Sequence, residues 1–408
     1  MMKLTTLESG LKVASRTMPG VETVAVGLYA EAGSRHEPAR VNGIAHLFEH
    51  MVFKGAGGRS AREISEAIED VGGDLNACTE RDGTSFTASL LAEHLPLGLE
   101  LLSDMVLRPH FAIDDLAREK EVVLQELAEA RDTPGDIIFD DLWMAAFPDQ
   151  PLGRSILGDE ASIGWIALED LHGWRSDLYR AGGLALIAAG KVDHDELVRL
   201  AETRFAGLAE GAIAPAESAR FHGGVRAREP KADQAHFAAA FPAPAIHDPD
   251  FYAARLFSDI VGGGTSSRLF QAVREERGLA YSIWSALQPY RDTGLFYFYA
   301  ATARREAAAA SALIAHVVAD AAQTATEREL DRAKAQAKTG LLMSLESSWG
   351  QANYLARRLA VLGRLAEPAE LVAEIDAVTL GEVRAAGAKM LAGERASATI
   401  GMPAVRAA

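Results

Sequence analysis

The sequence predicts an α+β fold in two homologous domains, each a mostly antiparallel sheet packed with helices. Its 408 residues exceed one ordinary hydrophobic core, and two domains of roughly 200 residues are the natural division. The predicted strands and the predicted helices are grouped in separate stretches of the sequence, as they are in α+β proteins. The order of these runs in the first half of the chain returns in the second half, which indicates a duplication.

The first half begins with a strand over residues 23–33 and a helix after it. Asn42 is expected to cap this helix, which ends at Lys54-Gly55, a basic residue in the last turn followed by glycine. Periodicity and turn signals in the rest of this half predict helices over 61–71, 93–107, 113–131 and 165–179, and strands over 74–80, 84–91 and 184–190.

The second half follows a run rich in Ala, Gly, Glu and Pro over residues 206–222, which is the best candidate for a linker. Beyond it the sequence predicts a strand over 235–241, a helix over 249–261, a strand over 296–302 and helices within 304–346. We therefore expect a first domain over 1–208, a linker over 209–222 and a second domain over 223–408.

Composition and charge exclude several classes of protein. The net charge of −16 argues against a nucleic-acid partner, because affinity for phosphates requires clustered Lys and Arg. No apolar run reaches the roughly 20 residues that span a bilayer, and the N-terminus shows no secretory signal. We therefore expect a cytoplasmic protein with no membrane association. Cys78 is the single cysteine, which excludes an internal disulfide and a cysteine-based zinc site.

The segment His46-Leu47-Phe48-Glu49-His50 carries the strongest chemical signal. On a helix, positions i and i+4 share a face, so His46 and His50 can hold one Zn²⁺ ion, with Glu49 beside them. The flanking residues are apolar almost all round, which predicts a buried helix. Because unpaired buried charge is costly, these side chains are expected to be metal-bound rather than two ordinary core or surface histidines. Glu49 would then take a proton from water, whose pKa zinc lowers to about 7.

A third ligand is expected on another helix, because catalytic zinc takes three protein ligands and keeps one position for water. The predicted helix over 113–131 offers many carboxylates, some of them on a stripe shared with apolar residues. The alternative is a charged helix face that is merely solvated. The pattern does not choose among its glutamates, which are Glu119, Glu121, Glu126 and Glu129.

The segment from Gly43 to Gly55 closely resembles the pitrilysin-like (inverzincin, M16) zinc metallopeptidases. Within that family it looks most like the β-subunit of the mitochondrial processing peptidase and its bacterial relatives, and the resemblance spans most of the chain. It implies a zinc endopeptidase in which His46, His50 and Glu126 bind one Zn²⁺ ion per chain and Glu49 is the catalytic base. It also implies that Glu119 supports the site by orienting a ligand.

The resemblance further implies residues that bind a peptide substrate. Asn76 and Ala77 would meet the substrate backbone at the edge of the strand over 74–80, and an inert edge strand is the alternative. Arg274 and Tyr281 would hold the backbone and stabilise the oxyanion. The glycine-rich run before Arg274 suits a phosphate as well, but it lacks the Gly-Lys-Ser/Thr of a nucleotide loop.

Two acidic residues and the length of the chain complete what the resemblance implies. Asp136 and Asp140 match carboxylates that hold an arginine near the cut, and a solvated helix start is the alternative.

Unfolded peptides would be cleaved in a closed chamber, with a preference for basic residues. Because single-chain members of the family are twice as long, we expect a homodimer, or a heterodimer with a related subunit, in which Arg274 and Tyr281 of one chain face the zinc of the other.

Two other functions remain open at this point. The same fold occurs in catalytically silent scaffold or partner subunits, which typically lose motif residues that this chain keeps. A metal-binding protein without catalysis is the other possibility, but it leaves Glu49 and the pair Arg274 and Tyr281 unexplained.

Overall fold

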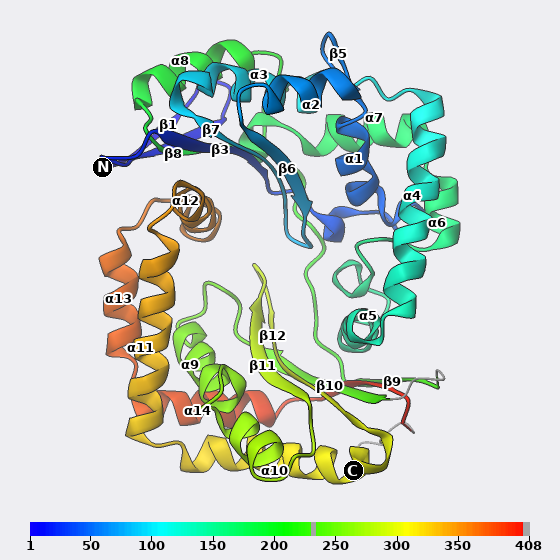
Figure 1. Cartoon of the computed structure of the whole chain (residues 1–408), viewed down its shortest axis with the longest axis vertical. Helices are drawn as coiled ribbons and strands as arrows, with labels where there is room; N and C mark the ends of the chain where they lie inside the picture. Colours follow the sequence, from blue (N-terminus) through cyan, green and yellow to red (C-terminus); the bar gives the residue numbers. More distant parts are fainter. Residues whose placement is uncertain (230–233, 403–408) are drawn as a thin grey trace. The chain divides into compact units, whose positions relative to one another are not determined.

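The computed structural model describes residues 1–229 and 234–402, which form two compact units (Figure 1). The first unit contains Met1–Leu127, Ser155–Glu217 and Leu342–Ala366; the second contains the remaining segments, which begin at Ala128, Ser218 and Glu367. Each unit is built on one sheet with helices packed against it. This is the predicted α+β fold.

The first unit is built on a six-stranded sheet in the order β1-β2-β8-β3-β7-β6. All neighbours run antiparallel except β2 and β8, which are parallel. Within the described residues, strand β6 pairs with β7 alone and therefore forms an edge. The strands are β1 Met2–Thr6, β2 Lys12–Thr17, β3 Thr23–Ala30, β6 Asp74–Thr79, β7 Thr84–Leu91 and β8 Leu184–Gly190, and a small hairpin pairs β4 Gly55–Ala56 with β5 Arg59–Ser60.

Helices cover both faces of the first sheet, because alternate side chains of its strands point to opposite sides. Val24, Val26 and Leu28 enter one apolar core, whereas Ala14 and Ala25 meet helix α12 on the other face. The helices of this unit are α1 Ile44–Val52, α2 Ala61–Glu69, α3 Leu95–Leu107, α4 Ile113–Asp132 except its last turn, α6 Glu160–Trp165, α7 Leu168–Leu178, α8 His194–Arg204 and α12 Ser348–Leu362.

The second unit is built on a five-stranded sheet in the order β11-β12-β10-β13-β9. Its only parallel neighbours within the described residues are β13 and β9. The strands are β9 Gly224–Arg228, β10 Gln234–Ala243, β11 Ser282–Pro289, β12 Gly294–Ala303 and β13 Ala396–Ile400. The helices are α5 Pro134–Ala146, α9 Phe251–Gly262, α10 Ala307–Thr324, α11 Glu327–Ser344 except its end, α13 Pro368–Ala377 and α14 Leu380–Leu391, with a π-helical turn at Phe270–Glu275.

The two sheets share one topology. Strands β2-β8-β3-β7-β6 of the first correspond in order to β9-β13-β10-β12-β11 of the second, and the single parallel pair falls at the same place. This correspondence supports the repeat that the sequence predicted, and β1 is the additional strand of the first sheet.

Each sheet receives one helix from the opposite half of the sequence. Ile138 and Leu142 of α5 join the core beneath the second sheet, and Leu355 and Leu359 of α12 join the core beneath the first. The compact units are therefore discontinuous along the chain. The contiguous domains 1–208 and 223–408 stay a prediction, and residues 209–222 between them contain no helix or strand.

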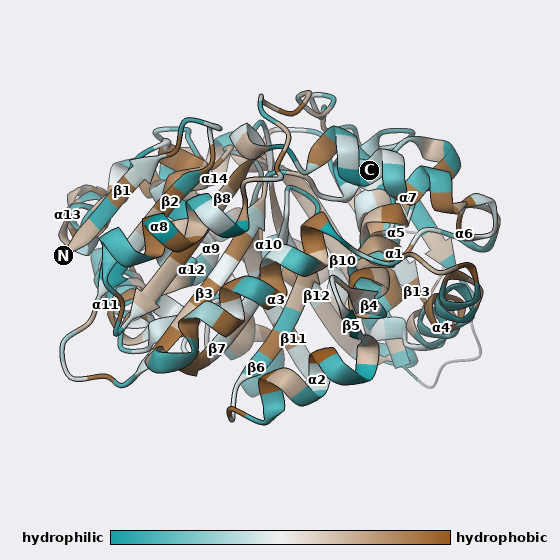
Figure 2. Ribbon diagram, turned by 90° about the horizontal axis from the view of Figure 1, so that it is seen from above, coloured by the Kyte–Doolittle hydropathy of each residue, from teal (hydrophilic) through white to brown (hydrophobic). Residues whose placement is uncertain are grey.

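Most predicted elements appear with small shifts at their ends. The strand over 84–91 is β7 with the same bounds, the strand over 23–33 is β3 Thr23–Ala30, and the helix over 165–179 is α7 Leu168–Leu178. The predicted helix over 113–131 is α4 with nearly the same bounds. In Figure 2 it is mostly teal with brown interruptions, because charged residues dominate it.

The prediction that Asn42 caps the first helix is wrong. Helix α1 begins at Ile44 after Gly43, which adopts a left-handed conformation with φ of 94°. The Asn42 side chain donates instead to the Glu37 carboxylate and to the Ser155 carbonyl. Glu37 is buried and accepts hydrogen bonds from the backbone amides of Gly43 and Ala45, at 2.8 and 2.9 Å. A carboxylate from outside the helix therefore caps the N-terminal end of α1.

No helix within the described residues is both long and apolar enough to cross a bilayer.

Candidate metal centre

Helix α1 is buried on all sides except the one that carries its polar residues. Its apolar residues Ile44, Ala45, Leu47, Phe48, Met51 and Val52 are almost completely inaccessible to solvent. His46, Glu49 and His50 are partly exposed, and their spacing of three and four residues places them on one side of the helix. The burial predicted from the apolar flanks is confirmed, with these three side chains at its open edge.

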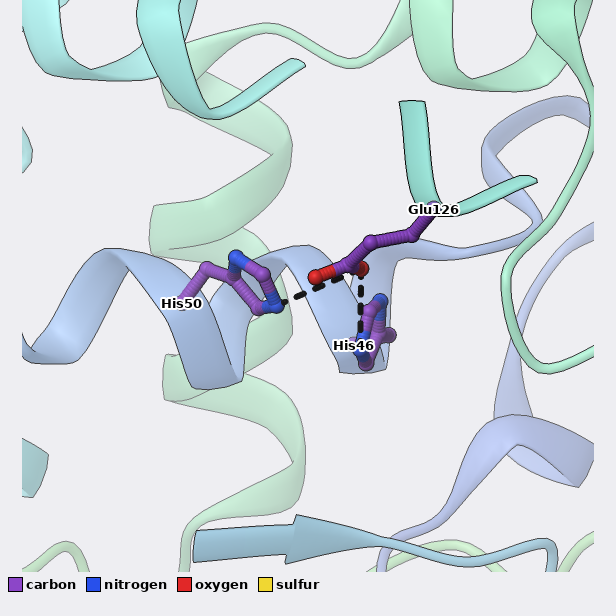
Figure 3. A group of neighbouring side chains, drawn as sticks. All are labelled: His46, His50 and Glu126. Atoms are coloured by element: carbon purple, nitrogen blue, oxygen red, sulfur yellow. Dashed lines mark ion pairs between the residues drawn. The ribbon is translucent and has the colours of Figure 1, made fainter. Parts of the chain in front are cut away.

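His46, His50 and Glu126 converge on one point (Figure 3). The Nε2 atoms of His46 and His50 lie 3.8 and 3.7 Å from Oε2 of Glu126. One ligand atom from each of the three residues lies within 4.8 Å of the other two, and no other such group of His, Cys, Asp and Glu occurs in the described residues. Two helices, α1 and α4, therefore present two imidazole nitrogens and one carboxylate oxygen to the same space.

This donor set fits a zinc ion in number, chemistry and spacing. Catalytic zinc uses three protein ligands of these types and leaves a fourth position open. A tetrahedral ion with bonds of about 2.0–2.1 Å holds its ligand atoms about 3.3–3.4 Å apart. The observed separations of 3.7 and 3.8 Å need a contraction of only a few tenths of an ångström.

Glu119 makes a hydrogen bond to the His50 ring. Its Oε2 accepts from His50 Nδ1 at 3.1 Å, and its Oε1 pairs with Lys54 Nζ at 2.9 Å. Glu119 is only 6% exposed, and because a buried charge is costly without partners, its contacts with His50 and Lys54 stabilise it. A proton on Nδ1 of His50 leaves the lone pair on Nε2, which is the atom that faces Glu126.

Burial and charge keep His46 neutral. Desolvation, followed by the effect of His50, lowers the pKa of His46 to about 4. The ring therefore carries no proton on one nitrogen at neutral pH, as a metal ligand requires. Its Nδ1 is buried without a hydrogen-bond partner, in contrast to His50.

Replacing Glu119 by glutamine is expected to weaken zinc binding by about 10–100-fold, because the amide no longer balances Lys54 or enhances the basicity of His50. Competition with a chromogenic chelator measures this affinity. Glu121→Gln is the matched control, because Glu121 lies on the same helix and is exposed. Equal zinc affinity in Glu119→Gln and wild type would contradict the role of Glu119.

Glu49 points to strand β6 rather than to the ligand group. Its Oε2 accepts from the hydroxyl of Thr79 at 2.5 Å. Burial raises the pKa of Glu49, while the hydrogen bond from Thr79 and the charge of His50 oppose that increase. A carboxylate with a raised pKa beside a metal site suits general-base chemistry.

The other residues that the sequence singled out lie at recognisable places. Asn76 and Ala77 lie on edge strand β6, where the Asn76 side chain accepts from the Ala77 amide at 2.8 Å. Arg274 and Tyr281 are neighbours in the second unit, with the guanidinium 5.6 Å from the Tyr281 ring centroid, and Tyr281 is 78% exposed.

The two acidic candidates lie on helix α5 of the second unit. Asp136 is exposed in the first turn and Asp140 is partly buried. Both belong to a helix that has its apolar face against the second sheet.

Three residues that contact the site or its helix were not assigned by sequence reasoning. Thr79 contacts Glu49, Lys54 pairs with Glu119, and Glu37 binds the first turn of α1. Lys54 was noted solely as a basic residue at a helix end. No pattern in the sequence marks Thr79, because its partner lies 30 positions away.

Comparison with known families matches nearly four-fifths of the chain. Residues 12–160 match the profile described as insulinase (peptidase family M16), and residues 166–337 match the peptidase M16 inactive domain. The first match contains His46, Glu49, His50 and Glu126.

Similar proteins are found in several bacteria. An "uncharacterized zinc protease" of Rickettsia felis is 33% identical over 97% of this chain and 96% of its own length. Another of Mycobacterium tuberculosis is 35% identical over 97% of this chain and 92% of its own length.

Among solved structures, a peptidase M16 inactive domain from Pseudomonas fluorescens has a TM-score of 0.92 at 24% identity, covering 99% of this chain and 98% of that one. A protease from Helicobacter pylori has a TM-score of 0.91 at 22% identity, covering 98% and 99%. These two structures support the fold.

Proposed function

The chain belongs to peptidase family M16 and is a zinc protease of that family, and we propose that it is an endopeptidase that cleaves unfolded peptides. The observation that carries the proposal is the convergence of His46, His50 and Glu126 with Glu49 beside them. We place it nearest the processing-peptidase branch, on the motif around His46 and the residues matched in both halves.

We assign the three converging residues to one zinc ion per chain. Helix α9 of the second sheet occupies the position that α1 has in the first, following the central strand β10, and it contains no histidine. The described residues contain one group with suitable donors. When bound, zinc supplies a Lewis acid that polarises a carbonyl and lowers the pKa of water to about 7.

Residues of the chain itself transfer the proton, orient a metal ligand and bind the substrate in this proposal. Glu49 takes the proton of the attacking water and passes it to the leaving amine. Glu119 holds His50 in the tautomer that keeps Nε2 unprotonated. Asn76 and Ala77 bind the substrate backbone as an added strand at the free edge of β6, which aligns the scissile bond.

The second half of the chain supplies further substrate contacts in this proposal. Arg274 and Tyr281 hold the peptide backbone and stabilise the oxyanion, and Asp136 and Asp140 bind an arginine of the substrate. We propose that two chains, identical or related, assemble around a closed chamber. Arg274 and Tyr281 of one chain then face the zinc site of its partner and bind the substrate there. The chamber excludes folded proteins.

A comparison of peptides tests this function. Quenched fluorescent peptides of equal length, with and without an arginine near the cut, are offered to the zinc-loaded protein, with a folded protein as the negative control. We expect cleavage of both peptides, faster cleavage of the one with arginine, and none of the folded protein. Equal rates would contradict the preference for arginine. Cleavage by a monomeric fraction from size-exclusion chromatography would contradict the assembly.

A further inference from the structure

Strand β6 presents one face to helix α1 and the other to solvent. Leu75, Ala77 and Thr79 are partly buried, and the residues between them are exposed. Leu75 and Ala77 pack against the apolar core that contains α1. Thr79 is the last residue of the strand and the one on this face with a hydroxyl, so the polar end of the face meets the polar side of α1.

The hydroxyl of Thr79 has two acceptors within reach, and the geometry favours one of them. Oγ1 lies 2.5 Å from Oε2 of Glu49 and 3.4 Å from the carbonyl oxygen of Ala45. A hydroxyl donates one hydrogen, and a bond to a carboxylate at 2.5–2.7 Å is of the strong, charge-assisted kind. The bond to Glu49 is therefore the one that Thr79 makes.

This hydrogen bond engages Oε2 of the Glu49 carboxylate and does not involve Oε1. The backbone of Thr79 also hydrogen-bonds this carboxylate and lowers its pKa, so the same residue holds Glu49 through two groups. A glutamate side chain has several rotatable bonds, and fixing one oxygen removes most of its freedom to turn. The remaining oxygen is thereby presented in a defined direction.

We propose that Thr79 is a positioning residue for Glu49: its hydroxyl holds Oε2 so that Oε1 faces the water to be deprotonated. The inference rests on the proposed function, in which Glu49 is the base. Because Thr79 belongs to the strand at which the peptide is proposed to add, a single strand positions both the substrate backbone and the base.

A purely structural role predicts a different result from the same substitution. If Thr79 served to tie β6 to α1, its loss would lower stability and substrate affinity together. If it orients Glu49, its loss lowers kcat, while KM and zinc content stay near their wild-type values, since the side chain faces α1 and is not one of the ligands.

Three variants separate these roles. Thr79→Val keeps the shape and removes the hydroxyl, and Thr79→Ser keeps the hydroxyl. Thr84→Val is the matched control, because Thr84 lies opposite Thr79 on β7 and donates to the Ala32 carbonyl at 2.8 Å, away from Glu49. We expect kcat to fall about 10–100-fold in Thr79→Val, with KM within about twofold, and to stay near wild type in the other two.

Crystal structures of the metal-free wild type and Thr79→Val give a readout that does not need activity. We expect the Glu49 carboxylate to leave its place, or to occupy several, in Thr79→Val. An unmoved carboxylate would overturn the inference, as would a wild-type kcat in Thr79→Val or an equal loss in Thr84→Val. If wild type cleaves no peptide, the proposed function fails, and the position of the carboxylate still decides the role of Thr79.

Discussion

Glu49→Gln is expected to reduce peptide hydrolysis by about 10²–10⁴-fold and to leave the zinc content unchanged. Glutamine has nearly the same shape and can still accept from Thr79, but its amide cannot take a proton from water. The proposed ligand atoms belong to His46, His50 and Glu126, so the proposed metal site keeps all its donors. Steady-state cleavage of a quenched peptide and metal analysis of the same sample measure both quantities.

The control for this experiment is Glu69→Gln, an exposed glutamate at the end of α2. It is expected to cleave like wild type. A Glu49→Gln protein with full activity would remove Glu49 from the mechanism, and one that lost zinc along with activity would assign Glu49 to the metal instead.

Glu126→Ala is expected to abolish zinc retention and activity together. The substitution leaves two histidine ligands from a single helix, and loss of a ligand should exceed the 10–100-fold effect on affinity that outer residues have. Dialysis followed by metal analysis, with the peptide assay alongside, measures the effect.

Glu129→Ala is the matched control, because Glu129 is exposed and lies one turn further along α4. It is expected to retain zinc and activity. If Glu126→Ala held zinc as firmly as Glu129→Ala, the third ligand would have to be sought elsewhere.

The sequence identified the helix of the candidate metal centre because its signal is local. His46 and His50 are four residues apart, and the apolar residues around them reveal burial without any knowledge of the fold. The choice of the third ligand depends on how α4 is turned against α1. Glu121 and Glu129 prove to be exposed, whereas Glu119 and Glu126 face His50 and the ligand group.

Contacts between distant segments were outside the reach of sequence patterns. Residues 74–80 could be recognised as a strand, but a period of two does not say which helix its inner face meets. The contact from Thr79 to Glu49 therefore appears first in the structure. Glu37 reaches the first turn of α1 from a turn that periodicity cannot describe, and this is why the prediction of Asn42 as the cap is wrong.

The same limit applies to the exchange of helices between the two halves. The apolar faces of α5 and α12 indicate that each packs on a sheet, but not on which one. The linker rich in Ala, Gly and Pro likewise gives no sign that α5 joins the second sheet and α12 the first.

An anomalous difference map of zinc-soaked crystals, recorded at the zinc absorption edge, tests the central claim most directly. We predict one strong peak per chain, about 2.0–2.2 Å from Nε2 of His46, Nε2 of His50 and a carboxylate oxygen of Glu126. A crystal with no peak between these three side chains, or with its strongest peak elsewhere, would contradict the account.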